Sequence, residues 1–78
     1  MEETISKIVE EWFLTEPLLF SAWCTHTLAE NTKMNVPMRT GKMRIEYNPD
    51  MIKDWGRRQI EERLRFEVIR ILLGHPYQ

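Results

Sequence analysis

The hydrophobic positions at the start of the chain repeat with a helical period. One stripe at that spacing holds Ile5, Ile8, Val9, Trp12 and Phe13. This pattern predicts a helix over about Thr4–Leu14. After Pro17, the chain is apolar on nearly every side of a second predicted helix, Pro17–Glu30. Its apolar residues are Leu18, Leu19, Phe20, Ala22, Trp23, Cys24 and Leu28. We expect this helix at the centre of the core or partly in an interface.

The period then changes from helical spacing to two, which is typical of strands. The alternating apolar positions are Met34, Val36 and Met38, followed by Met43, Ile45 and Tyr47. We predict a β-hairpin that puts Met38 opposite Met43, Val36 opposite Ile45 and Met34 opposite Tyr47, all on one face. Pro37 has no N–H to donate, which favours a four-residue loop at Arg39–Lys42 and an edge position for its strand.

Two further helices are predicted. Asn48 is a good N-cap, and Pro49 suits the first helical position, so a short helix should begin there and end at Gly56. Its inward residues would be Met51, Ile52 and Trp55. A long helix should then run from about Arg57 to Leu73 and end at Gly74. The predicted fold class is α+β, with the order helix, helix, β-hairpin, short helix, long helix, in a single small domain of residues 1–78.

The long helix carries two apolar faces. The first holds Ile60, Leu64, Val68, Ile71 and Leu72, and the second holds Phe66, Ile69 and Leu73. The residues after this helix are too few to cover the second face. Either another molecule covers it, or a longer natural protein was cut here. The interface candidates are therefore Trp23, Phe66, Ile69 and Leu73, and the expected partner is a second copy or another protein.

Composition and charge favour some classes of function for this chain and argue against others. The chain has 78 residues, 42% of them hydrophobic and 29% charged, which is typical of a small globular domain. The net charge of −1 argues against nucleic-acid binding. Residues 1–30 hold six acids and one base, whereas residues 31–78 hold ten bases and six acids. We expect the two parts to dock on each other or to pair in a dimer, and the sharper alternative is a basic patch for an acidic partner.

The sequence also bears on location. No apolar stretch is long enough for a transmembrane helix, and the first residues lack the pattern of a signal peptide. The single cysteine, Cys24, cannot form an internal disulfide. We therefore expect a cytoplasmic protein without a membrane partner.

One segment of the long helix resembles a catalytic motif. Zinc peptidases of the zincin type place H-E-x-x-H on a helix, where two histidines one turn apart bind zinc and the glutamate is the general base. In this chain Glu67 stands at the glutamate position, while Phe66 and Arg70 stand at the two histidine positions. His75, after Gly74, could match a downstream ligand.

The order of motifs extends this likeness. A Pro17-Leu18-Leu19-Phe20 start precedes the predicted hairpin, an Ile45-Glu46-Tyr47-Asn48-Pro49 segment follows it, and the helix ends in Gly74-His75-Pro76. Over roughly Leu14–Pro76 the chain resembles the metallopeptidase domain found at the N-terminus of bacterial proteins with a von Willebrand factor A-like domain. The resemblance implies a minimal zincin-like fold, a bacterial source and a zinc cofactor in the family.

The departures from that family argue against zinc peptidase activity. Phenylalanine cannot bind zinc, and the fixed positive charge of arginine repels it. A catalytic zinc needs about three protein ligands. The resemblance therefore implies a pseudoenzyme that has lost zinc. The two predicted apolar helices, in a chain too short to cover both, lead us to expect that it works through protein association, as a homodimer. Phe66 would extend the core where a ligand stood, and Arg63, Glu67 and Arg70 would form a chain of ion pairs.

Two other functions stay open at this point. One is a divergent metal-dependent hydrolase, with Glu67 as base and His75 as one ligand, completed by residues outside this chain. The other is a binder of nucleic acid or of an acidic protein. It would use Arg57, Arg58, Arg63, Arg65 and Arg70. These arginines spread around the helix and do not form one stripe, which argues against the second alternative.

Overall fold

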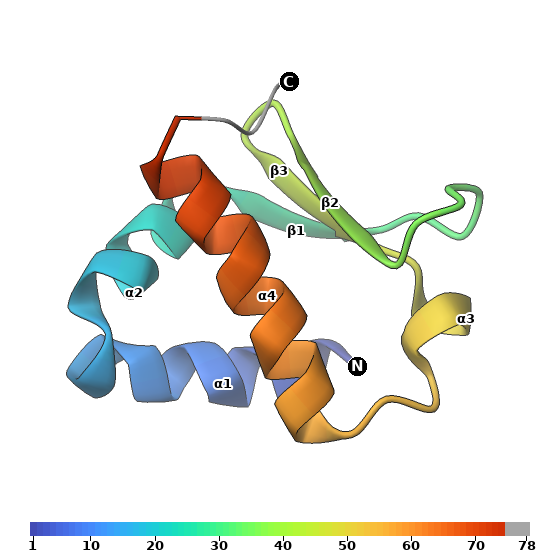
Figure 1. Cartoon of the computed structure of the whole chain (residues 1–78), viewed down its shortest axis with the longest axis horizontal. Coiled ribbons are helices and arrows are strands. Elements are labelled where there is room, and N and C mark those ends of the chain that lie inside the picture. Colours follow the sequence, from blue (N-terminus) through green and yellow to red (C-terminus); the bar gives the residue numbers. More distant parts are fainter. Residues whose placement is uncertain (75–78) are drawn as a thin grey trace.

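The computed structural model describes residues 1–74, and its helices and strands form an α+β fold, as predicted (Figure 1). The elements are α1 (Glu2–Thr15), α2 (Pro17–Cys24), β1 (Thr27–Glu30), β2 (Met38–Gly41), β3 (Arg44–Tyr47), α3 (Pro49–Ile52) and α4 (Arg57–Leu72). The three strands form one sheet in the order β1-β3-β2. The first and last helices confirm the predictions made from helical periodicity.

Helix α4 lies between the sheet and the pair formed by α1 and α2, and it packs on β2, α2 and α1 (Figure 1). The core forms where these elements meet. Its largest fully buried side chains include Trp12, Tyr47, Ile5, Ile8, Met38, Ile45, Ile52, Leu64 and Val68. Trp23 and Trp55 are partly buried against this core.

The acidic first part of the chain docks on the basic last part. Arg57 of α4 forms an ion pair with Glu11 of α1. Arg65 pairs with Glu16, between α1 and α2, at 3.2 Å from Nη2 to Oε2. In these two ion pairs, acidic residues of the first part of the chain bind basic residues of the last part. This confirms the docking that the charge pattern predicted.

Helix α2 is shorter and less buried than predicted. It ends at Cys24, and Thr27–Glu30 is not helical but forms the edge strand β1, which pairs in parallel with β3. The Thr25 hydroxyl donates to the Ala22 carbonyl at 2.7 Å, and the His26 amide turns back to Trp23, so the last turn tightens and stops. Of the predicted apolar residues, Leu18 and Cys24 are exposed, and only Leu19 and Ala22 are buried. The prediction of a central helix was therefore wrong.

The hairpin exists, but its predicted register is wrong. Met38 pairs with Tyr47, where Met43 was expected, and the turn lies at Lys42-Met43. Met43 takes a left-handed conformation there, with φ 55°. Both registers keep Met38, Ile45 and Tyr47 on one face, because they differ by an even number of residues. The buried face of the sheet was thus predicted correctly and the partners on it were not.

Pro37 lies just before β2, which is an edge strand as predicted. Its carbonyl accepts the Asn48 amide at 2.9 Å. Most residues at this position would also donate their own N–H back to the Asn48 carbonyl, but Pro37 has no N–H. The Asn48 carbonyl accepts the Met51 amide at the start of α3 instead. A proline is therefore tolerated opposite a residue that begins a helix.

Asn48 ties the hairpin to the preceding loop and confirms its predicted role as N-cap. Its side-chain oxygen accepts the Asp50 amide at 3.1 Å, and its Nδ2 donates to the Met34 carbonyl at 2.9 Å. The side chain is buried. Helix α3 then ends at Ile52, and Gly56 is the N-cap of α4, so the expected stop of α3 at Gly56 was wrong.

We expect Asn48→Ala to lower the free energy of unfolding by about 2–3 kcal/mol, because it removes the cap and leaves the Met34 carbonyl without its donor. Asn48→Ser keeps a cap oxygen and should cost less. Urea denaturation measures both, with Asn35→Ala as the control, because Asn35 is an exposed asparagine in the loop between β1 and β2. Equal stability of Asn48→Ala and Asn35→Ala would contradict the assigned role.

The burial of the Tyr47 phenol predicts a loss of stability at alkaline pH. Burial raises the pKa of Tyr47 to about 12, from the ordinary 10.0, and the carboxylates of Glu30 and Glu2 add to the rise. The neutral phenol therefore stabilises the fold fully below pH 10, and this stability is lost as the pH rises toward 12. Denaturation at several alkaline pH values should show a decline that Tyr47→Phe reduces. The same decline in both proteins would contradict this assignment.

Candidate functional site

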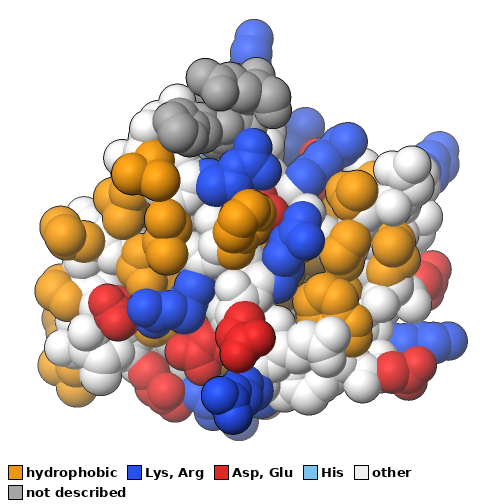
Figure 2. Space-filling view, in the orientation of Figure 1, with side chains coloured by type: hydrophobic (Ala, Val, Ile, Leu, Met, Phe, Trp, Pro, Cys, Tyr) orange, Lys and Arg blue, Asp and Glu red, His pale blue; other side chains and the backbone are white. Residues whose placement is uncertain are grey.

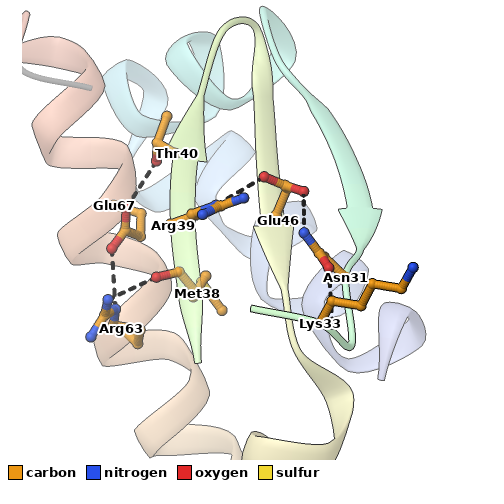
Figure 3. A network of polar contacts seen from close by, with 8 residues as sticks. All are labelled: Asn31, Lys33, Met38, Arg39, Thr40, Glu46, Arg63 and Glu67. Atoms are coloured by element: carbon orange, nitrogen blue, oxygen red, sulfur yellow. Dashed lines mark hydrogen bonds and ion pairs between the residues drawn. The ribbon is translucent and has the colours of Figure 1, made fainter. Parts of the chain in front are cut away.

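The residue at the general-base position of the resembled motif, Glu67, is fully buried between α4 and the sheet (Figure 3). The Thr40 hydroxyl donates to its Oε1 at 2.9 Å. Arg63 Nε donates to its Oε2 at 3.1 Å, and Arg70 Nη1 lies 3.9 Å from Oε1. Both carboxylate oxygens thus have partners, and the predicted Arg63–Glu67–Arg70 chain of ion pairs is confirmed.

Arg63 also connects α4 to the edge of the sheet. Its Nη2 donates to the Met38 carbonyl at 2.8 Å, while its Nε holds Glu67 (Figure 3). Because β2 is an edge strand, this bond satisfies a carbonyl that no neighbouring strand can reach. The polar cluster of Thr40, Arg63 and Glu67 therefore acts as a link between helix and strand.

This arrangement does not suit general-base catalysis. A general base must lie within hydrogen-bond reach of the proton that it removes from a substrate. The Glu67 carboxylate has no solvent-accessible surface, and its oxygens are occupied by Thr40 and Arg63. The geometry favours a structural carboxylate at this position.

Thr40 is the member of the cluster that the sequence did not reveal. In the predicted hairpin Thr40 lay in the loop, whereas in the structure it pairs with Ile45 and is buried. The signal that could have found it is its alternation with Met38, which places both side chains on one face of β2. A threonine facing the helix that carries Glu67 is a natural hydrogen-bond donor.

Phe66, at the first degenerate ligand position, does not extend the core, so that expectation was wrong. Its side chain is exposed. The guanidinium carbons of Arg63 and Arg70 lie 5.5 and 5.8 Å from its ring centroid. Both distances fall within cation–π range, so the ring is flanked by positive charge on the molecular surface.

A second polar cluster lies on the sheet face away from α4 (Figure 3). Asn31 Nδ2 donates to Glu46 Oε2 at 2.9 Å, and Arg39 Nε donates to Oε1 at 3.0 Å. The hydrogen bond from Asn31 holds the pKa of Glu46 below its ordinary value; burial opposes this effect, and Arg39 adds to it. This cluster ties the loop after β1 to the hairpin.

Metal ligation was predicted at most through His75 and a carboxylate near the site, and His75 lies outside the described residues. Within residues 1–74, no three histidine, cysteine, aspartate or glutamate side chains are grouped so that they could hold a metal ion. Arg70 occupies the second degenerate ligand position and contacts Glu67.

None of the helices between Met1 and Gly74 has both the length and the apolar character needed to cross a membrane.

Hydrophobic side chains gather over α2 and the neighbouring C-terminal half of α4 (Figure 2). We call this the α2/α4 apolar surface. Its exposed residues are Leu18 of α2, the adjoining Phe13 and Leu14 at the end of α1, and Phe66, Ile69 and Leu72 of α4 with its C-cap Leu73. Three of the four predicted interface candidates belong to it, and the fourth, Trp23, is partly buried beside the core.

No protein-family model, no curated protein and no solved structure matches the sequence.

Proposed function

We propose that this chain is a non-catalytic domain that acts through protein association, using the α2/α4 apolar surface, and that a second copy is its first partner. The observation that carries the proposal is the exposure of large apolar side chains, which gather over α2 and the C-terminal half of α4 (Figure 2). Leu14 and Leu18 are 81% and 72% exposed, and Leu73 is 62% exposed. A gathering of exposed large apolar side chains is typical of interaction sites.

The resemblance to the bacterial metallopeptidase domain supports the same proposal. At the position of the family's general base, Glu67 holds α4 to β2 and is closed to solvent. The ligand positions hold Phe66 and Arg70, which cannot bind zinc. A degenerate scaffold of this kind keeps its fold and serves binding.

Light scattering over a concentration series tests the proposal. The mass of the purified chain is expected to rise from monomer toward dimer through the micromolar range, because the exposed apolar side chains become buried on association. A compact monomer at every concentration, without a change in mass, would contradict self-association.

In a separate experiment, zinc calorimetry tests the proposal that the chain has lost the zinc site of a metallopeptidase. Metal-stripped protein is expected to show no tight stoichiometric zinc binding, because the two histidine positions of the motif are lost. The control is His75→Ala, which should leave any weak heat of zinc binding unchanged. One tight site that disappears in His75→Ala would favour the alternative of a divergent metal-dependent hydrolase.

A further inference from the structure

Every arginine of α4 forms an ion pair within the chain. The pairs are Arg57–Glu11, Arg58–Glu62, Arg63–Glu67, Arg65–Glu16 and Arg70–Glu67. These are the arginines that the sequence offered for an acidic partner. Because carboxylates of the same chain already bind them, α4 is a poor place for a second acidic ligand.

The basic residues before and within the hairpin are in a different situation. Residues 31–45 contain no acid and four bases, Lys33, Arg39, Lys42 and Arg44, all of them exposed. Within residues 1–74, the side chains of Lys42 and Arg44 form no hydrogen bond or ion pair, and Arg39 uses only its Nε, toward Glu46. Positive charge without a counter-charge is therefore concentrated on the hairpin.

The strand pairing brings three of these bases together. Arg39 and Arg44 lie on the sheet face away from α4, because Gly41 pairs with Arg44 and lies two residues after Arg39. Lys42 follows Gly41 in the turn. We call Arg39, Lys42 and Arg44 the basic hairpin surface. Gly41 has no side chain that could cover Arg44, and Figure 2 shows basic side chains over the hairpin with little acidic surface among them.

The face of the sheet that carries Arg39 and Arg44 is not covered by the rest of the fold. Along β2 and β3 the buried side chains alternate with exposed or partly exposed ones, and the buried set faces α4. Each of these strands has four residues, a length of about 13 Å. The open surface is thus long enough for a short extended segment of another chain.

The chemistry of the basic hairpin surface fits carboxylates. Guanidinium groups bind carboxylates in a planar, charge-assisted geometry. The same face already holds one carboxylate in this way, since Arg39 Nε and Asn31 Nδ2 donate to the two oxygens of Glu46 at 3.0 and 2.9 Å. Met43, in the turn between Lys42 and Arg44, is 58% exposed and offers an apolar contact beside the charges.

The charge of the whole chain favours a short acidic segment over nucleic acid. A protein that binds nucleic acid usually neutralises many phosphates along the polymer. This chain has a net charge of −1, and its first thirty residues hold six acids. A long polyanion would meet that acidic part, whereas a segment of a few residues would contact the hairpin alone.

We propose that the basic hairpin surface binds an acidic segment of another protein. Arg39, Lys42 and Arg44 contact its carboxylates, and Met43 contacts an apolar side chain of the same segment. This is the acidic partner that the uneven charge of the sequence suggested, bound by the hairpin and not by α4. The surface is separate from the α2/α4 apolar surface, so the inference does not depend on self-association.

Fluorescence anisotropy tests the proposal with a labelled oligoglutamate peptide that carries one central leucine. The ionic strength is physiological, so that charges farther than about 8 Å from the peptide are largely screened. The double variant Lys42→Gln/Arg44→Gln is expected to raise the Kd of the peptide about fivefold or more. The matched control, Lys7→Gln/Lys53→Gln, removes the same charge from exposed lysines on α1 and after α3, and should change the Kd less than about twofold.

Three results would overturn the proposal. The first is an unchanged anisotropy when the wild-type chain is added to the peptide. The second is equal weakening by the two double variants, which would assign the effect to net charge. The third is tighter binding of an oligothymidylate of the same charge, which would make nucleic acid the partner. Circular dichroism checks that each variant is folded. A wild type that binds the peptide but stays monomeric would overturn self-association and support the basic hairpin surface.

Discussion

Glu67→Ala is expected to lower the free energy of unfolding by about 3 kcal/mol, the lower end of the range for breaking a buried ion pair. The carboxylate is fully buried, and its removal leaves the Thr40 hydroxyl without an acceptor and Arg63 without its counter-charge. The lower end applies because the Arg63 side chain is 32% exposed and can recover some hydration. Urea denaturation followed by circular dichroism measures the change.

The same helix provides a matched control. Arg58 and Glu62 have the same residue types, spacing and direction as Arg63 and Glu67, but both side chains are exposed. Glu62→Ala should therefore change the stability by no more than about 0.5 kcal/mol. Glu67→Gln keeps an oxygen for Thr40 and should cost about 1–2 kcal/mol. If Glu67→Ala were no more harmful than Glu62→Ala, the link between α4 and β2 would have no energetic importance.

Leu18→Ser is expected to raise the dimer Kd more than about 100-fold, because each dimer would lose two buried leucines, worth about 3–6 kcal/mol together. Leu18 is largely exposed in the monomer, so the variant should remain folded. Sedimentation equilibrium compares it with Met51→Ser, which changes an exposed apolar residue on α3, outside the α2/α4 apolar surface. Equal weakening by both variants would show that the effect is not specific to this surface.

The elements with strong local signals were predictable from the sequence. The apolar stripes of α1 and α4 repeat at helical spacing over several turns, and Asn48-Pro49 marks the start of α3. The ion pairs of Glu67 with Arg63 and Arg70 followed from the same helical spacing. Each of these signals lies within one short segment of the chain.

The features that depend on distant segments could not be predicted in this way. Thr27–Glu30 has too few residues to show a period, and its strand conformation comes from pairing with β3. The hydrophobic pattern could not choose between hairpin registers that put Met38, Ile45 and Tyr47 on the same face. Thr40 became a partner of Glu67 only when the actual register placed it opposite α4.

The exposure of the apolar residues shows a similar limit. The second apolar face of α4 was recognised from spacing, since Phe66, Ile69 and Leu73 lie on one side of the helix. The contribution of Phe13, Leu14 and Leu18, at the corner between α1 and α2, was not recognised. Phe13 was expected on the inward stripe of α1, and α2 was expected at the centre of the core. The mean apolar character of α2 does not reveal which of its sides meets α4.

The most direct test of association through the α2/α4 apolar surface is a series of amide NMR spectra of the wild-type chain at increasing concentration. Our account predicts that resonances of the α1–α2 corner and of the C-terminal half of α4 shift or broaden together as the concentration rises. Resonances of the hairpin turn at Lys42-Met43 should stay unchanged. Spectra that do not change with concentration, or changes confined to the hairpin, would contradict the account.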